Sequence, residues 1–173
     1  MILARPSDQL LLPVNPFFIT ITLLGALLLQ MLPGGRLPAA PDLLALVLVF
    51  WNVHQPRRVG VGFAFAFGLI MDIHQGAVLG QHALAYTLLS YLAISVHRRV
   101  LWFSLPVQAL HVLPVFFAAH AVSMVARLLV GGMFPGWLVL LAPLFEALLW
   151  PVVVVLLLAP QRRAPDPDKN RPL

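Results

Sequence analysis

The sequence of 173 residues contains no cysteine and very little charge. Without cysteine the chain can form neither disulfides nor thiolate metal sites, and it has no cysteine nucleophile. Charged residues make up only 10% of the chain, whereas a soluble domain of this length needs more of them to cover its surface. Hydrophobic residues make up 61%, and the mean hydropathy is +0.93. Membrane-spanning segments therefore explain the composition better than a soluble core does.

The motifs of common catalytic machineries are also missing. No serine lies in a nucleophile-elbow pattern, and the chain has no Gly-rich phosphate loop, no His-Glu-x-x-His and no intramembrane pair of aspartates. These absences argue against a hydrolase and against an intramembrane protease. We expect a protein that is not an enzyme, with no catalytic, cofactor-binding or metal-binding residues and no cofactor.

The basic balance of the chain, a net charge of +5, raises the question of nucleic acid as a partner. The arginines, however, occur as short pairs at the ends of apolar runs, and no basic face is interleaved with aromatic residues. Such pairs anchor helices to an anionic membrane leaflet. We therefore expect a lipid bilayer as the partner and no nucleic acid.

Six apolar segments can be drawn, separated by turn-forming residues at 33–35, 56, 74–76 and 131–136. The pattern predicts an all-α integral membrane protein with a single six-helix transmembrane domain over residues 1–160. The remaining residues, 161–173, are polar and rich in proline, and we expect this cytoplasmic tail to be disordered. The predicted helices are 17–32, 42–54, 59–71, 76–96, 106–130 and 137–159.

The second and third segments are short, about 20 Å of helix against a hydrocarbon core of roughly 30 Å, so they could form a re-entrant hairpin instead. The basic residues decide between these alternatives. If all six segments cross and the N-terminus is cytoplasmic, nine basic residues lie on the cytoplasmic side, Arg36 lies outside and Arg127 lies within the fifth helix. This bias predicts six crossings with both termini in the cytoplasm. The nine are Arg5, Arg57, Arg58, Arg98, Arg99, Arg162, Arg163, Lys169 and Arg171.

Small residues recur at helical spacing in the third and fourth segments. One stripe contains Gly60, Ala64 and Gly68 and ends at Asp72, and the other contains Gly76, Gly80 and Ala83 and continues through Thr87 and Ser90. Small residues allow membrane helices to approach closely, where packing supplies the attraction. We expect both stripes to form helix-packing faces, either against each other or against a partner protein.

Polar residues cluster around the turn between these two segments: Asp72, His74, Gln81 and His82. An Asp-x-His followed by a second histidine could bind zinc. The favoured interpretation is that Asp72 caps the turn or the next helix by accepting backbone N–H groups.

Glu146 is the only glutamate of the chain and lies well inside the sixth segment. An ionisable group within a membrane needs a partner. His120 and Glu146 are each thirteen residues from Met133, at the centre of the intervening loop, so they lie at the same depth. Arg127 is about 10 Å nearer the surface by helix rise. We therefore predict a Glu146–His120 contact, with Arg127 as the second choice, and either a structural or a relay role.

An ordered set of motifs runs from about Pro41 to Tyr91. It consists of Pro41-Asp42, Phe50-Trp51, Pro56-Arg57-Arg58-Val59-Gly60, Gly62-Phe63, Gly68-Leu69-Ile70-Met71-Asp72 and Gly76-Ala77-Val78-Leu79-Gly80-Gln81-His82-Ala83-Leu84-Ala85-Tyr86. This pattern resembles the family of the rod shape-determining protein MreD. The chain length, the six segments, Glu146 and Trp150-Pro151 fit the form found in proteobacteria.

The resemblance implies a non-enzymatic membrane scaffold of the bacterial cell-wall elongation complex, required for rod shape and lateral peptidoglycan synthesis, in the inner membrane. Its implied partners are MreC, RodA, a class B penicillin-binding protein and, directly or through other subunits, MreB. The implied fold is similar to the substrate-binding membrane subunits of energy-coupling-factor transporters. That similarity leaves an alternative, a membrane subunit that binds a small, vitamin-like solute. Such a pocket would use Asp72, Gln81, His82 and Arg127.

Overall fold

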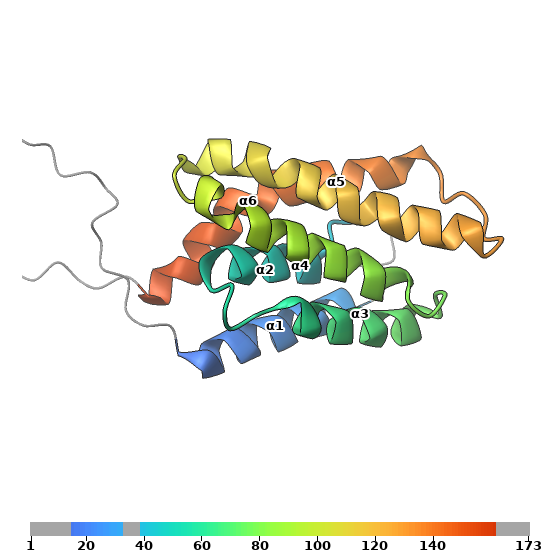
Figure 1. Ribbon diagram of the computed structural model, residues 1–173, viewed down its shortest axis with the longest axis horizontal. Helices are drawn as coiled ribbons and strands as arrows, with labels where there is room; N and C mark the ends of the chain where they lie inside the picture. The colour runs from blue at the N-terminus through green and yellow to red at the C-terminus, as the bar shows by residue number, and fades with distance from the viewer. Residues whose placement is uncertain (1–14, 33–38, 162–173) are drawn as a thin grey trace, which may run out of the picture.

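The computed structural model describes residues 15–32 and 39–161. These residues form six α-helices, two short 3-10 helices and no strand, which confirms the all-α prediction. Figure 1 shows them side by side as a bundle. The elements are α1 (Pro16–Gln30), α2 (Leu43–His54), α3 (Val61–Gln75), α4 (Gln81–Val100), α5 (Leu105–Leu129), η3 (Trp137–Leu141), α6 (Ala142–Leu158) and η4 (Ala159–Gln161).

The boundaries of α3 and α4 differ from the sequence prediction, and the first five residues of the predicted sixth helix form η3. Helix α4 begins at Gln81 and not at Gly76, because Gly76 and Gly80 have φ angles of +60° and +102° and form the turn that precedes it. It also continues to Val100, so Arg98 and Arg99 lie in its last turn. Helix α3 extends to Gln75, which places Asp72 inside the helix. Gln161, predicted to start the tail, belongs to η4, and the rest of the tail lies outside the described residues.

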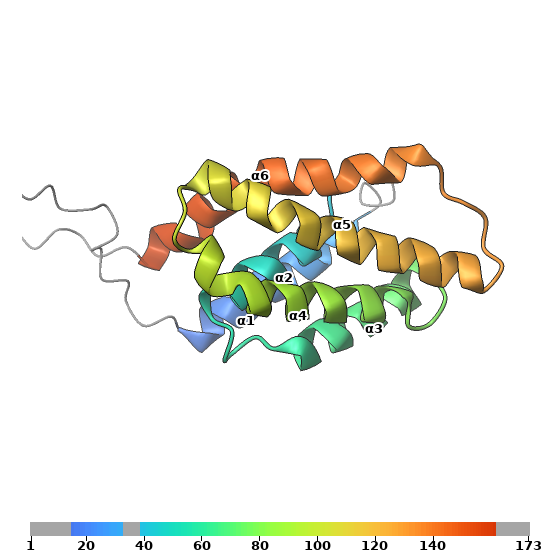
Figure 2. The same ribbon diagram turned by 45° about the horizontal axis from the view of Figure 1, so that its top comes forward.

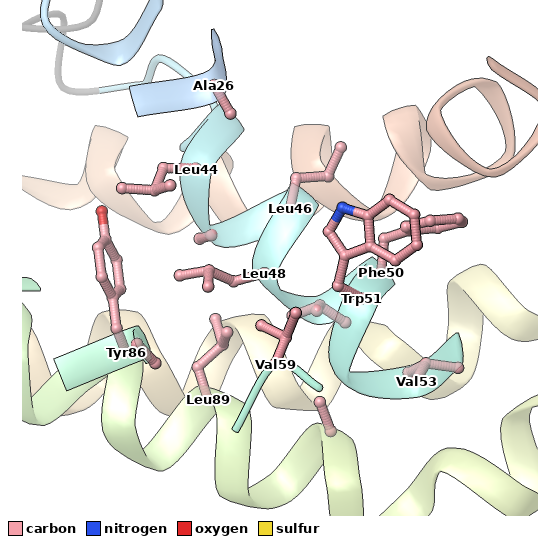
Figure 3. Close-up of a cluster of buried hydrophobic side chains, with 14 of the residues drawn as sticks. Ala26, Leu44, Leu46, Leu48, Phe50, Trp51, Val53, Val59, Tyr86 and Leu89 are labelled. Carbon is pink, nitrogen blue, oxygen red and sulfur yellow. The ribbon is translucent and has the colours of Figure 1, made fainter. Parts of the chain in front are cut away.

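Helix α2 forms the centre of the bundle. Nine of its 12 residues are buried, on all sides of the helix, and it packs against α1, α4 and α6. Figure 3 shows Leu44, Leu46 and Leu48 of α2 among side chains of neighbouring helices, with Tyr86 and Leu89 reaching up from α4. A helix that is apolar on every side belongs in a core. A helix of about 18 Å that is enclosed by protein need not match the thickness of a bilayer, because its backbone ends are shielded from lipid.

The peripheral helices carry large apolar side chains on their outward faces. Exposed examples lie on α1 (Phe17, Leu28), α3 (Phe63, Ile73) and α6 (Leu148). Large apolar side chains exposed on several helices are typical of contact with a membrane or with another protein. The bundle is thus apolar both inside and outside, as expected for a protein embedded in lipid.

By length and apolar composition, two stretches of the described chain qualify as membrane spans, namely α5 and residues 137–161. Helices α1, α2 and α3 are apolar but shorter than 18 residues. The six helices nevertheless alternate in direction along the chain, so that each end of the bundle receives every second connection (Figures 1 and 2). Six crossings therefore remain a prediction.

Candidate functional site at the carboxylate end

The three carboxylates of the described chain and four of its five arginines lie at opposite ends of the bundle, while the fifth arginine, Arg127, lies at the same end as the carboxylates. Asp42, Asp72 and Glu146 lie near the α1–α2, α3–α4 and α5–α6 connections, which we call the carboxylate end. The opposite end carries exposed arginines in the α2–α3 connection and in the last turn of α4, and we call it the arginine end. Its arginines are Arg57, Arg58, Arg98 and Arg99. The other two predicted anchors, Arg162 and Arg163, lie outside the described residues.

Glu146 is fully buried and contacts two other helices. Its Oε1 lies 2.8 Å from His120 Nε2 on α5, which confirms the contact predicted from their equal spacing to Met133. The same Oε1 accepts the backbone N–H of Asp42 at 2.9 Å. Arg127, the second choice of partner, is exposed and forms no ion pair with any described residue. Glu146 therefore joins the starts of α2 and α6 to the middle of α5.

Asp42 extends this contact into a network that sequence analysis did not anticipate. Its Oδ1 accepts the N–H of Ala45 at 2.9 Å and so caps α2, while its Oδ2 accepts the hydroxyl of Tyr86 on α4 at 2.5 Å. Gln30 at the end of α1 accepts the N–H of Leu43 at 3.0 Å. An aspartate between a proline and an apolar run is a recognisable N-cap signal. Nothing in that signal indicates Tyr86 or Glu146.

Asp72 organises the turn between α3 and α4. Its carboxylate accepts the backbone N–H groups of Gly80 (2.8 Å), His82 (2.7 Å) and Ala83 (3.3 Å), which confirms the predicted capping role. The imidazole Nδ1 of His82 lies 2.8 Å from Asp72 Oδ1. No group of three potential metal ligands occurs among the described histidines and carboxylates. The zinc alternative is thus without support in the described chain, and Asp72 serves as a helix cap.

The two small-residue stripes meet each other at one point. A Cβ added at Gly68 would lie 2.4 Å from Ala83 Cα, closer than any real side chain is found, and Ala64 on the same stripe is also fully buried. The packing face is therefore shorter than predicted. A Cβ added at Gly60, Gly76 or Gly80 would meet nothing within 4 Å. Gly76 and Gly80 form the turn through their positive φ angles and pack against no neighbouring helix of the described chain, so for these two residues packing against a partner protein stays a prediction.

A cavity of about 250 Å³ opens at the carboxylate end and receives polar side chains from four helices. A second cavity of about 50 Å³ lies against it and shares Asp42, His82, His120 and Ser123. Gln81 donates to Ser123 at 3.0 Å and so bridges α4 and α5 beside the cavity. Three of the four residues expected for a solute pocket line it, while Asp72 does not. The polar lining is Gln30, Asp42, Gln75, Gln81, His82, His120, Ser123 and Arg127.

Comparison with known proteins identifies the family to which the chain belongs. The family model of the rod shape-determining protein MreD matches residues 10–159. The chain belongs to the MreD family. The rod shape-determining protein MreD of Haemophilus influenzae is 30% identical over 125 residues, which cover 72% of this chain and 77% of that protein.

Membership in the MreD family has direct consequences. It is a family of membrane proteins that determine rod shape, and it is not known as a family of enzymes. No solved structure matches the chain significantly. The expected likeness to energy-coupling-factor transporter subunits therefore stays a prediction.

Proposed function

We propose that the chain is a non-enzymatic scaffold of the cell-wall elongation complex, required for rod shape and lateral peptidoglycan synthesis. The observation that carries this proposal is the match of the MreD family over residues 10–159. A role in rod shape follows from family membership itself, and the scaffold role is the finer step proposed here.

The use of the polar side chains supports a scaffold. Asp72 accepts three backbone N–H groups, and Asp42 and Glu146 each join separate helices. These groups hold the bundle in shape, while large apolar side chains on α1, α3 and α6 face outward. A rigid bundle with apolar outer faces is suited to packing against the transmembrane helices of other proteins.

The proposed partners are MreC, RodA, a class B penicillin-binding protein and MreB, directly or through other subunits. The proposed location is the bacterial inner membrane, with six crossings, both termini cytoplasmic and the arginine end in the cytoplasm. Alternation of the six helices supports this topology, as does the gathering of Arg57, Arg58, Arg98 and Arg99 at one end. Central placement of α2 supports it further, because a helix surrounded by protein need not match the bilayer.

Affinity purification from native membranes tests the scaffold. We expect MreC and RodA to co-purify with the tagged chain, and depletion of the chain to round the cells. Co-purification of a pair of ATPase subunits, with cell shape unchanged after depletion, would instead indicate a transporter.

A second candidate function, binding of a small polar solute in a transporter-like subunit, is favoured by the cavity of about 250 Å³ at the carboxylate end. Its lining joins Asp42 with Arg127, so the cavity offers groups of both charge signs. A thermal-shift screen of small polar solutes on the purified protein tests this function. A solute that raises the melting temperature of the wild type must not raise that of Ser123→Leu, in which the larger side chain would fill the cavity. Ser95→Leu, on the exposed face of α4, serves as the control.

A further inference from the structure

A cavity of about 460 Å³ lies at the arginine end, at the turn between α4 and α5. It is lined by Arg98, Arg99, Trp102, Phe103 and His111. We infer that this cavity, which we call the basic pocket, binds the headgroup of an anionic phospholipid. The inference uses the membrane location that the family shows and does not depend on the scaffold proposal.

The two arginines of the basic pocket supply its positive charge. Arg98 and Arg99 are exposed, and neither forms an ion pair with the described residues. All three carboxylates of the described chain lie at the opposite end of the bundle, where they are engaged in hydrogen bonds. The basic pocket therefore presents two cations without a counter-anion from the described chain. Arginine recognises phosphate oxygens through several N–H donors at once.

The aromatic wall of the basic pocket favours a lipid over a free phosphate. Trp102 is 90% exposed and Phe103 is 44% exposed, so the wall of the basic pocket beside the arginines is aromatic. Tryptophan is enriched where membrane meets water, because its ring is apolar and its N–H is polar. A phospholipid supplies both an anion for the arginines and chains for the apolar surface, whereas inorganic phosphate supplies only the anion.

The wall of the basic pocket is held in place before any lipid arrives. Gln108 donates to the carbonyl of Phe103 at 3.0 Å and accepts the indole N–H of Trp150 on α6 at 3.3 Å. The rings of Phe103 and His111 stack with centroids 4.5 Å apart. His111 Nδ1 lies 2.9 Å from the carbonyl of Val107. These contacts tie the α4–α5 turn to α6, and a preorganised site loses less entropy when it binds.

The test titrates phosphatidylglycerol onto the full-length protein in a neutral detergent and counts bound lipids by native mass spectrometry. Phosphatidylcholine with the same acyl chains serves as a lipid without net negative charge. Inorganic phosphate serves as an anion without acyl chains. We expect phosphatidylglycerol to bind most tightly and millimolar inorganic phosphate not to displace it. The double variant Arg98→Gln/Arg99→Gln should weaken phosphatidylglycerol binding about 30-fold, at about 1 kcal/mol for each arginine.

The matched control is Arg57→Gln/Arg58→Gln, which removes the same charge from the same end of the bundle. It should change the affinity by less than about threefold, since neither residue lines the basic pocket. Trp102→Ala removes a side chain that is almost fully exposed, so it should keep the fold and still weaken phosphatidylglycerol binding severalfold. Thermal unfolding of each variant verifies that it is folded.

Three outcomes would overturn the inference. An equal loss of phosphatidylglycerol affinity in the two double arginine variants would show a general attraction to anionic lipid. Displacement of phosphatidylglycerol by inorganic phosphate would show a site for free anions. Tighter phosphatidylglycerol binding by Asp166→Asn/Asp168→Asn would show that the chain's own C-terminal carboxylates occupy the basic pocket.

Discussion

His120 Nε2 on α5 lies 2.8 Å from Glu146 Oε1 on α6, and the same oxygen accepts the backbone N–H of Asp42 at the start of α2. One buried carboxylate thus connects three helices. Its second oxygen, Oε2, has no hydrogen-bond partner among the described residues. Because one oxygen carries both contacts, a neutral amide at this position can reproduce them.

The first prediction concerns this pair. Glu146→Gln should be tolerated, because the amide oxygen can still accept from His120 and from Asp42. Glu146→Leu should lower the stability in detergent by about 1–3 kcal/mol, since it leaves buried donors without an acceptor. His120→Leu should be comparably harmful, and the double change to leucine should cost less than the sum of the two single changes.

Stability in detergent of the wild type, the two leucine variants and their combination forms a double-mutant cycle. Phe145→Leu, at an exposed neighbouring position of α6, provides the control and should be close to neutral. Strict additivity of the two leucine changes would contradict direct contact between the side chains.

The second prediction concerns the approach of α3 to α4. Gly68→Ala should destabilise the bundle by about 1–3 kcal/mol, because the new Cβ would meet the backbone of Ala83 at 2.4 Å and the helices would have to separate. Gly68→Leu should be worse and should impair assembly. Gly62→Ala is the matched control on the same helix, where a Cβ meets nothing within 4 Å. Equal melting temperatures for Gly68→Ala and Gly62→Ala would contradict the close contact between Gly68 and Ala83.

The third prediction concerns the cap of α4. Asp72→Ala should cost about 1–3 kcal/mol, because the N–H groups of Gly80, His82 and Ala83 lose their shared acceptor. His82→Ala should cost less, since the backbone N–H of residue 82 still reaches Asp72. Thermal unfolding in detergent compares the two. If His82→Ala proved the more damaging change, the side-chain contact and not the cap would be the important one.

The fourth prediction concerns topology, and the absence of cysteine makes it simple to test. A single cysteine at Gln55, beside the Arg57-Arg58 pair, should be protected from a membrane-impermeant maleimide in intact cells. A cysteine at Met133 in the α5–α6 connection, which is 83% exposed, should be labelled from outside. After the cells are opened, both should react. External labelling at Gln55 would rule out six crossings with the arginine end in the cytoplasm.

Local patterns predicted the parts of the site that depend on neighbours along one helix or one hairpin. The apolar runs predicted six helices, although the boundaries of α3 and α4 differ from the prediction by two to five residues. Equal spacing from Met133 predicted the His120–Glu146 contact, because two antiparallel helices joined by one loop place such positions at the same height. The cap by Asp72 was predictable for the same reason, since its partners begin eight residues later in the chain.

The network around Asp42 could not be obtained in this way. Its partners Tyr86 and Glu146 lie 44 and 104 residues away, and no helical period relates such positions. The place of Gly76 and Gly80 in a turn could not be obtained from the sequence either, because small residues at helical spacing suit a packing face and a turn equally well. Their φ angles distinguish the two.

That the chain is helical and apolar, and that its basic residues occur as pairs between apolar segments, follows from the sequence alone, because each of these properties is a sum over residues or a pattern within one segment. The central position of α2, the contact of Gly68 with Ala83 and the network of Asp42, Tyr86, His120 and Glu146 depend on how distant segments pack, and only the three-dimensional arrangement shows them. The physical reason is that in lipid the apolar faces of helices do not specify their partners. Close packing and buried hydrogen bonds between distant segments select the arrangement.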